Sequence, residues 1–215
     1  SEIGTAVDVD RYKTLTKRKK INAFLQVQQM LSGFRKSFAV KTPLAFAKDF
    51  DYNEKPAVIG YRSSASFDFV NNNIVFLQPT RLMPRKRIEI GFQLIERLFK
   101  NSDFHAKFDN NPKLTLTFLI TGPIPMGQVD YSKKLLQKFD ELLKSLPPKY
   151  RERVFLAFLF SEFDKERFKK KVQDPVDIPE LYNIASLIML PSETEGRGLP
   201  IIEATSCGIP IFCRR

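Results

Sequence analysis

Cysteine, histidine and long apolar runs are scarce or absent in this sequence. There are two cysteines, Cys207 and Cys213, one histidine, His105, and no tryptophan. Two cysteines outside a CxxC pattern do not form a disulfide framework, so we expect two buried thiols in a reducing compartment. One histidine excludes a multi-histidine metal site within this chain, and we expect His105 to lie in a surface loop.

No stretch of about 18 apolar residues occurs, which excludes a membrane-spanning helix of ordinary length. The sequence starts at Ser1 without a basic-then-apolar signal pattern. Hydrophobic residues nevertheless make up 43% of the 215 residues, which is enough for a folded core. These observations lead us to expect a cytoplasmic protein.

Positive charge is in excess, with 35 Lys and Arg against 24 Asp and Glu, a net charge of +11. This favours anionic partners such as nucleotide phosphates, an acidic membrane surface or nucleic acid. We interpret the runs at 17–20 and 165–171 as solvated helical faces. Nucleic-acid binding would rest on charge alone, and we do not expect it.

From residue 74 onward, short apolar runs alternate with helical patterns. The apolar runs at 74–77, 114–121, 154–159, 187–190 and 209–213 predict five strands. The run at 154–159 lacks alternation, so both its faces should be covered, and Gly122-Pro123 ends the run at 114–121. Helical spacing of apolar residues separates them, as at 86–99 and 135–146. The sequence therefore predicts an α/β fold with a Rossmann-like, doubly wound parallel sheet, whose ligands bind at the carboxyl ends of the strands.

Residues 1–73 have a different pattern. Phe24, Val27, Leu31, Phe34 and Phe38 recur at helical spacing. We expect a helical segment packed on the sheet domain, with a partner-binding helix as the alternative. Residues 49–66 are polar and rich in turn formers and predict an irregular crossover. The predicted organisation is a lead-in segment at 1–73 and a nucleotide-sugar-binding domain at 74–215.

The segment after the fourth strand carries the clearest chemistry. Gly196 and Gly198 permit close approach of a ligand to the backbone, and the helix that begins near Pro200 directs free amides at this loop. Glu195 and Glu203 flank the loop. Acids beside an anion site are unfavourable unless they accept hydrogen bonds, and sugar hydroxyls can donate them. The pattern suits a sugar nucleotide, with phosphates on the amides and hydroxyls on the acids.

Arg81 and Lys86 follow the first strand and form a suitable pair for a diphosphate. Taken alone, this segment fits ordinary surface charge equally well. The aspartates at 8 and 10 and at 49 and 51 have the spacing of a DxD metal motif, but such triplets are common and we expect no metal site.

Residues 195–203 resemble the E-x7-E motif of retaining glycosyltransferases of the GT-B fold, specifically glycosyltransferase family 4. Further segments are similar to that family in the same order along the chain. They are Val7 to Tyr12 ("GVD…F"), Thr80 to Leu82 with Lys86 ("GRL…KG"), Glu180 to Ser186 ("ELY..AD"), Pro191-Ser192 ("PS"), and Glu203-Ala204 with Cys207 to Pro210 ("EA..CG.P").

The resemblance implies the C-terminal, donor-binding half of a GT-B enzyme that transfers a hexose from a UDP-, GDP- or ADP-sugar with retention and without a cofactor. It implies that Arg81 and Lys86 hold the diphosphate, that Glu195 contacts the sugar and that Glu203 binds the ribose. The remaining donor-binding residues that it implies are Thr80, Gly122, Phe158 beside the base, and the amides of Arg197, Gly198 and Leu199.

Three departures from the family pattern surround the donor: Thr80 and Arg87 replace glycines, and Arg197 replaces an aromatic residue. The resemblance also implies that the acceptor-binding domain and the last elements of the donor domain are missing. We therefore expect this chain alone to bind donor without completing the reaction. The alternative is a non-catalytic nucleotide-sugar-binding or interaction module, with a basic face for an acidic partner or the inner membrane surface.

Overall fold

The computed structural model describes residues 10–32, 40–41, 57–61, 69–122, 125, 127–159, 176–195 and 198–214. Its centre is a parallel sheet of five strands, in the spatial order β5-β4-β3-β6-β7. Their bounds are β3 Asn73–Gln78, β4 Thr115–Ile120, β5 Val154–Phe158, β6 Leu187–Leu190 and β7 Ile211–Cys213. If these five strands are numbered 1 to 5 along the chain, their spatial order is 3-2-1-4-5, which is the order of a Rossmann-like sheet. The predicted fold class is therefore confirmed.

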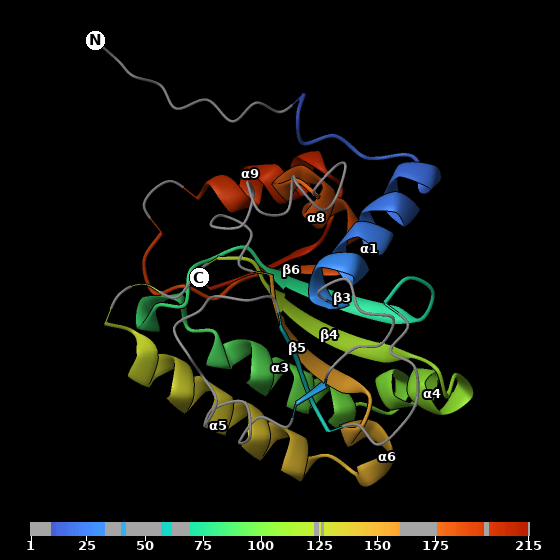
Figure 1. The fold of residues 1–215 in the computed structure, drawn as a ribbon, viewed down its shortest axis with the longest axis vertical. Coiled ribbons are helices and arrows are strands. Elements are labelled where there is room, and N and C mark those ends of the chain that lie inside the picture. Colours follow the sequence, from blue (N-terminus) through green and yellow to red (C-terminus); the bar gives the residue numbers. More distant parts are fainter. Residues whose placement is uncertain are drawn as a thin grey trace.

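The central strands are apolar on both faces because helices cover both sides of the sheet (Figure 1). Every residue of β4 and β5 is buried. Successive side chains point to opposite faces, so Phe118 belongs to one hydrophobic cluster and its neighbour Leu119 to the other. This explains why β5 has no polar alternation in the sequence.

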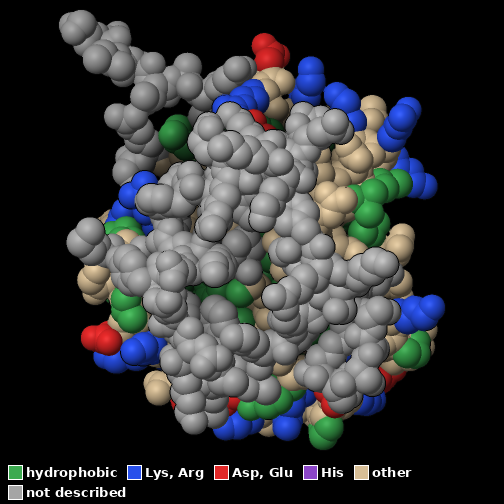
Figure 2. All heavy atoms as spheres, viewed as in Figure 1, with side chains coloured by type: hydrophobic (Ala, Val, Ile, Leu, Met, Phe, Trp, Pro, Cys, Tyr) green, Lys and Arg blue, Asp and Glu red, His purple; other side chains and the backbone are tan. Residues whose placement is uncertain are grey.

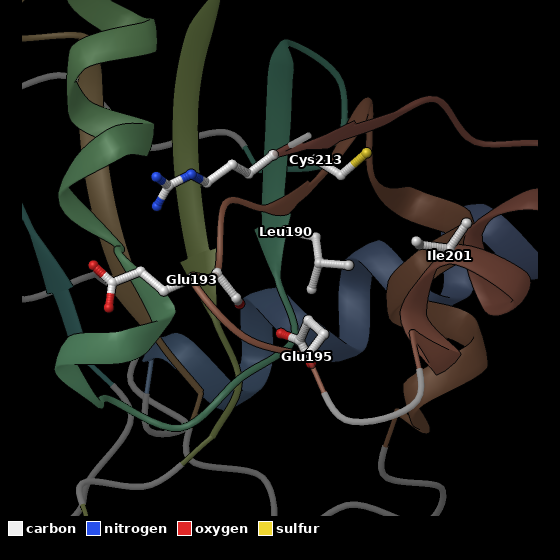
Figure 3. A pocket seen from close by; sticks show the side chains of 7 residues that line it. Leu190, Glu193, Glu195, Ile201 and Cys213 are labelled. Atoms are coloured by element: carbon white, nitrogen blue, oxygen red, sulfur yellow. The ribbon is translucent and has the colours of Figure 1, made fainter.

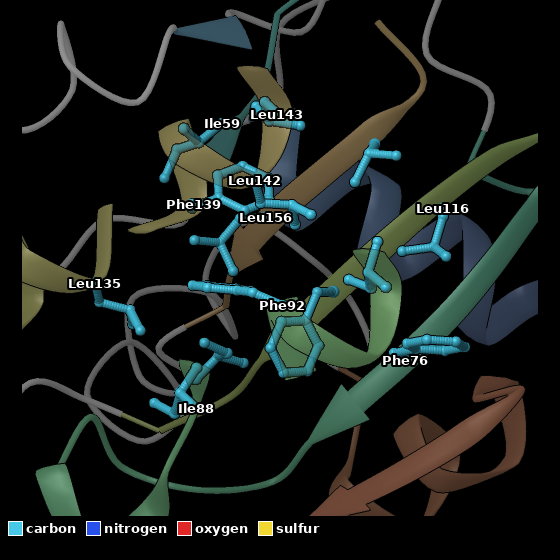
Figure 4. Packing of buried hydrophobic residues seen from close by; sticks show 14 of the residues in the cluster. Ile59, Phe76, Ile88, Phe92, Leu116, Leu135, Phe139, Leu142, Leu143 and Leu156 are labelled. Atoms are coloured by element: carbon cyan, nitrogen blue, oxygen red, sulfur yellow. The ribbon is translucent and has the colours of Figure 1, made fainter. Parts of the chain in front are cut away.

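The first cluster lies between the sheet and helices α3 (Glu89–Lys100), α4 (Ser102–Asn110), α5 (Val129–Ser145) and α6 (Pro148–Arg151). Phe92 from α3 is at its centre (Figure 4). Its ring lies 5.3 Å from that of Phe139 on α5 and 5.7 Å, edge to face, from that of Phe118 on β4. These contacts fix α3 against the sheet and therefore fix the start of the helix that follows the first parallel strand.

The second cluster lies on the other face, under α1 (Lys17–Ser32), α8 (Ile178–Ile184) and α9 (Leu199–Ser206). Ala23 and Val27 of α1, Tyr182 of α8 and Ala204 of α9 are all buried in it. Helix α1 thus packs on the sheet domain. It begins seven residues before Phe24, and the predicted apolar positions Phe34 and Phe38 lie outside the described residues.

Two short strands were not expected. Strand β2 (Ala57–Ile59) pairs antiparallel with β5, and β1 (Val40–Lys41) pairs parallel with β2. The sheet is therefore mixed, and the prediction of an irregular crossover at 49–66 is wrong for residues 57–59. Three apolar residues gain strand structure here because β5, almost 100 residues further on, offers a free edge.

The predicted loop around His105 is also wrong. Residues 102–110 form α4, whose N-cap is Asn101, and the Asn101 side chain accepts a hydrogen bond from the Phe104 amide at 3.0 Å. The His105 ring stacks on Tyr150, with 6.2 Å between ring centroids. A polar segment becomes a helix because its cap and two phenylalanines, Phe104 and Phe108, supply a start and an apolar face.

Candidate functional site

The strand order reverses between β3 and β6. These two strands lie side by side in the sheet. The strand that follows β3 in the chain, β4, lies on one side of this pair, and the strand that follows β6, β7, lies on the other. Ligands of open α/β sheets bind outside the carboxyl ends of the strands at such a reversal. The segments that leave β3 and β6 there are residues 79–88 and 191–198, which hold most of the predicted site residues.

Lys86 and Glu195 meet at this reversal. The Lys86 Nζ lies 2.5 Å from Glu195 Oε1, with 13% and 23% of the two side chains exposed. Lys86 ends a short 3₁₀ helix, η1 (Pro84–Lys86), and its carbonyl accepts a hydrogen bond from Gln78 Nε2 at 2.8 Å. Because Gln78 is the last residue of β3, the sheet itself sets the position of the lysine.

The ion pair affects the titration of Glu195. Burial opposes ionisation, but the hydrogen bond from Lys86, with further contributions from Ser192 and Arg85, outweighs it and lowers the pKa of the carboxyl below its ordinary value. Glu195 is therefore a carboxylate at neutral pH. It can accept hydrogen bonds from hydroxyl groups, and it does not resemble a carboxylic acid kept ready to donate a proton.

Further contacts bind the two segments together. The Glu193 amide donates to the Arg85 carbonyl at 2.9 Å, and the Arg85 guanidinium donates to the Thr194 carbonyl at 3.1 Å. Arg87 forms ion pairs with Glu89, at 2.9 Å, and with Glu193. Three consecutive basic residues, 85–87, thus all contact the segment that follows β6, residues 191–195. Each does so through its side chain, and Arg85 does so through its backbone carbonyl as well.

Arg87 has a left-handed backbone, with φ of +49°. This conformation is unfavourable for a residue with a Cβ and is normal for glycine. It accounts for the glycine that the resemblance implies after the lysine. In this chain the arginine adopts the same backbone conformation and uses its side chain to link η1 to α3 and to the β6 segment.

Gly122 lies where the segments after β3 and β4 touch. Its amide donates to the Thr80 carbonyl at 2.9 Å, and a Cβ at this position would lie 2.4 Å from that same oxygen and 2.6 Å from the Arg81 amide nitrogen. The glycine therefore permits a backbone contact that supports Thr80 and Arg81. The donor contact expected for Gly122 stays a prediction, and the structure shows this steric role.

A cavity of about 600 Å³ adjoins Glu195. Ile201 of α9 and Cys213 of β7 lie on one side of it, and Glu193 lies on the other (Figure 3). Cys213 is exposed, so the expectation of two buried thiols is wrong for this residue and correct for Cys207. The edge strand β7 leaves Cys213 without a covering element in the described structure.

Glu203 is half-buried on α9 and does not line that cavity. Its Oε2 accepts a hydrogen bond from the hydroxyl of Tyr182, on α8, at 2.7 Å. Tyr12 packs edge to face on Tyr182, with 5.6 Å between the ring centroids. Neither tyrosine was predicted to belong to the site, although both lie in segments that resemble the family, Tyr12 at the end of "GVD…F" and Tyr182 within "ELY".

The other predicted residues are at the following places. Gly198 is the N-cap of α9 with φ of +61°, and Leu199 is the first residue of that helix. Arg81 is exposed after β3, and Arg197 lies outside the described residues. Phe158 is 1% exposed and belongs to the first hydrophobic cluster, which corrects the prediction that it stands beside a base. Its side chain lies on the same face of β5 as those of Val154 and Leu156, which belong to the same cluster.

The described part of the chain holds neither a metal-binding cluster nor a membrane-spanning helix. It holds no group of three or more Cys, His, Asp or Glu side chains arranged to bind a metal ion. Of the four aspartates with DxD spacing, only Asp10 is among the described residues. None of the described helices is long and apolar enough to cross a membrane.

Comparison with known proteins is consistent with the motifs. A segment of 37 residues is 54% identical to the O-antigen chain mannosyltransferase B of Escherichia coli. This segment covers 17% of this chain and 10% of that protein. Similar solved structures are the C-terminal domain of a glycosyl transferase group 1 family protein (LpcC) from Francisella tularensis and Anabaena Alr3699/HepE in complex with UDP and glucose.

The first of these structures has a TM-score of 0.48 at 13% identity, over 97% of this chain and 70% of that one. The second has a TM-score of 0.44 at 20% identity, over 94% of this chain and 50% of that one. This chain thus spans only part of these proteins. Residues 163–215 match the family model for glycosyl transferases group 1. The matched segment carries both Glu195 and Glu203.

Proposed function

We propose that this chain is the donor-binding domain of a retaining glycosyltransferase that moves a hexose from a nucleoside-diphosphate sugar to an acceptor. The observation that carries the proposal is the Lys86–Glu195 pair at the reversal of strand order, within a chain whose C-terminal segment matches a glycosyltransferase family. A cation and a carboxylate side by side suit a ligand that joins a diphosphate to a sugar.

In this proposal Lys86 and Arg81 bind the diphosphate, together with the amides of residues 197–199 at the start of α9. When the bond to the sugar breaks, negative charge grows on the leaving diphosphate, and fixed cations and helix amides stabilise it. Glu195 accepts hydrogen bonds from the sugar, and Glu203 accepts them from the ribose. Since side chains supply the positive charge, donor binding needs no metal ion or cofactor.

The catalytic unit of this proposal includes a second, acceptor-binding domain, and this chain alone binds donor without turnover. Binding is therefore the direct test. The chain is titrated with UDP, GDP and ADP, and then with the glucose and mannose conjugates of the nucleotide that binds best. Mannose is included because a matching segment occurs in a mannosyltransferase. Binding that persists in a chelator supports the metal-free site, and no binding of any nucleotide contradicts the proposal.

Three substitutions separate the roles. Lys86→Met is expected to weaken nucleoside diphosphate binding about 10- to 100-fold, because a hydrogen bond to a charged group is lost. Glu195→Gln is expected to leave binding of the diphosphate intact, since Lys86 is freed, while the added affinity contributed by the sugar disappears. Glu203→Ala is expected to weaken the nucleotide with or without sugar, and unchanged nucleotide affinity in this variant would contradict the donor site.

A second candidate function is contact with an acidic membrane surface. The first turn of α1 is Lys17 to Lys20 with no acidic residue, at the positive end of the helix dipole, where an anion is stabilised. Ile21 and Leu25 are each 43% exposed on the same helix. Figure 2 shows Lys and Arg side chains gathered at its upper right, around α1, with an apolar patch among them.

Under this second proposal the protein acts at the inner, cytoplasmic face of a membrane. The chain should sediment with phosphatidylserine-containing vesicles and not with pure phosphatidylcholine vesicles. A variant with Lys17 and Lys20 changed to Glu should stay in the supernatant. If this variant sediments as the parent chain does, the basic surface of α1 is not a membrane contact.

A further inference from the structure

Helix α8, of seven residues, is held in place by contacts at its start and near its end. Asp177 and Glu180 form a capping box at its start, with the Asp177 amide donating to Glu180 Oε2 at 2.8 Å. Asn183 accepts from the Leu15 amide at 2.8 Å and donates to the Lys13 carbonyl at 3.0 Å. The segment before α1 is thereby tied to α8, which brings Tyr12 beside Tyr182.

Tyr182 is fully buried except that its hydroxyl reaches Glu203. Burial, and then the Glu203 carboxylate, raise the pKa values of both Tyr182 and Tyr12 above the ordinary range. Both phenols are therefore neutral and keep their protons at any physiological pH. A buried phenol of this kind has one donor, and Tyr182 directs it at Glu203.

Glu195 and Glu203, the two acids of the segment that resembles E-x7-E, thus have different partners. Glu195 is paired with a lysine, whereas no lysine or arginine of the described segments forms an ion pair with Glu203. A neutral donor orients a carboxylate without cancelling its charge. An ionised carboxylate offers about four acceptor positions, and the Tyr182 hydroxyl occupies one of them.

We infer that Tyr182, supported by Tyr12, is a positioning residue that holds the Glu203 carboxylate to accept two neighbouring ribose hydroxyls of the donor nucleotide. This inference rests on the proposed function, because it takes Glu203 as the ribose contact. The rival explanation is that the Tyr182–Glu203 hydrogen bond merely fastens α9 to α8. The rival predicts a change in stability alone, so a ligand-based readout separates the two.

The experiment compares ribonucleotide with 2′-deoxyribonucleotide. The nucleoside diphosphate that binds best among UDP, GDP and ADP is titrated alongside its 2′-deoxy form, into the full chain and into Tyr182→Phe. The parent chain should prefer the ribonucleotide about tenfold, as expected for a hydrogen bond to a charged group. In Tyr182→Phe the preference should fall to about twofold, while affinity for the deoxynucleotide changes little.

Tyr150→Phe is the matched control. Tyr150 is also a buried tyrosine whose hydroxyl donates to a carboxylate, that of Asp109, at 2.9 Å, but it lies on α6 at the far end of the sheet. It should keep the full ribose preference. Should Tyr182→Phe fail to fold, Tyr12→Phe takes its place, because Tyr12 is only half-buried. This variant removes the Tyr12 hydroxyl, which also interacts with the Glu203 carboxylate, so it should also reduce the preference.

The outcomes are distinct. A ribose preference that Tyr182→Phe or its substitute retains in full overturns the inference and leaves the proposed function standing. A parent chain that binds no nucleotide, or binds both forms equally, overturns the ribose role of Glu203 itself. Loss of preference in Tyr150→Phe as well would assign the effect to general destabilisation and overturn the inference too.

Discussion

At the scale of single residues, Arg87 combines an unfavourable backbone with a favourable side chain. Its φ of +49° would suit glycine, whereas its guanidinium pairs with Glu89 and Glu193. Both Arg87→Ala and Arg87→Gly remove the ion pairs, but only the glycine also relieves the backbone. We expect Arg87→Gly to be the more stable of the two by about 1 kcal/mol, measured by urea unfolding.

The same pair of variants tests the link between the two site segments. If the Arg87 side chain holds residues 191–195 against η1, both variants should weaken nucleotide binding equally in spite of their different stabilities. Equal stabilities would mean that the left-handed backbone at residue 87 carries no strain, and unchanged binding would mean that the link to Glu193 does not support the site.

The titration of Glu195 gives a pH prediction. Its pKa is lower in the folded chain than in the unfolded one, so the folded state holds the proton less readily. The resulting stabilisation is fully present above the ordinary glutamate pKa of about 4.3 and is lost as the pH falls through the folded value. Acidification from pH 7 to pH 3 should therefore destabilise the parent chain more than it destabilises Glu195→Gln.

The control for this comparison is Glu141→Gln, an exposed glutamate on α5 away from the site. Urea unfolding at the two pH values should give it the same acid sensitivity as the parent chain. If Glu195→Gln is equally sensitive, the ion pair with Lys86 contributes nothing to the pH dependence of folding.

At the scale of elements, the sequence predicts what local pattern determines. Strands β3 to β6 and helices α3 and α5 were predictable, because buried strands lack polar residues and helices with one apolar side repeat every three or four residues. Strand β2 was not, since its three residues become a strand only by pairing with β5, a partner distant in sequence. Helix α4 was predictable in principle from Asn101 and the spacing of Phe104 and Phe108, which its polar residues obscured.

The contacts of the candidate site also divide into those that the sequence predicts and those that depend on packing. The meeting of Lys86 and Glu195 followed from the sheet, because the carboxyl ends of neighbouring parallel strands share an edge. The hydrogen bond from Tyr182 to Glu203 and the ion pair from Arg87 to Glu193 join elements whose packing angles no local pattern specifies. Phe158 shows the limit most plainly, since its strand was predicted correctly and the complete burial of its ring was not.

Arg153 joins elements at the opposite edge of the sheet. Its Nη1 donates to the carbonyls of Phe108 and Asn111, at 2.8 and 3.0 Å, and its guanidinium lies over the ring of Phe108 at 5.0 Å. The end of α4 is thus attached to the residue before β5. Arg153→Lys keeps the charge but loses the planar fork, and the partial exposure of the side chain limits the effect. We expect a loss of about 1–2 kcal/mol in urea unfolding.

Hydrogen exchange can assign that loss to an element. Amides of α4 should exchange faster in Arg153→Lys, whereas those of α8 and α9 on the other face should be unaffected. Faster exchange throughout the chain, without a preference for α4, would show that Arg153 supports the whole sheet and not this attachment.

At the scale of the whole molecule, the two edges of the parallel sheet have separate tasks. The carboxyl edge holds Lys86 and Glu195, and the amino edge holds Arg153 with the α4 and α6 helices (Figure 1). A strand of six residues such as β4 separates the edges by about 20 Å. Sites this far apart with no shared partners usually act independently in their effects on stability.

We therefore expect stability and nucleotide binding to separate by edge. Arg153→Lys should lower the free energy of unfolding and leave nucleotide affinity within about twofold of the parent chain, while Lys86→Met should weaken the nucleotide. In the double variant, the two changes in unfolding free energy should add to within about 0.5 kcal/mol. Calorimetric titration and urea unfolding of all four chains measure this directly. Two outcomes would contradict this expectation: changes in unfolding free energy that do not add in the double variant, or weakened nucleotide binding in Arg153→Lys alone. Either would mean that the strands of the sheet transmit a change at one edge to the other.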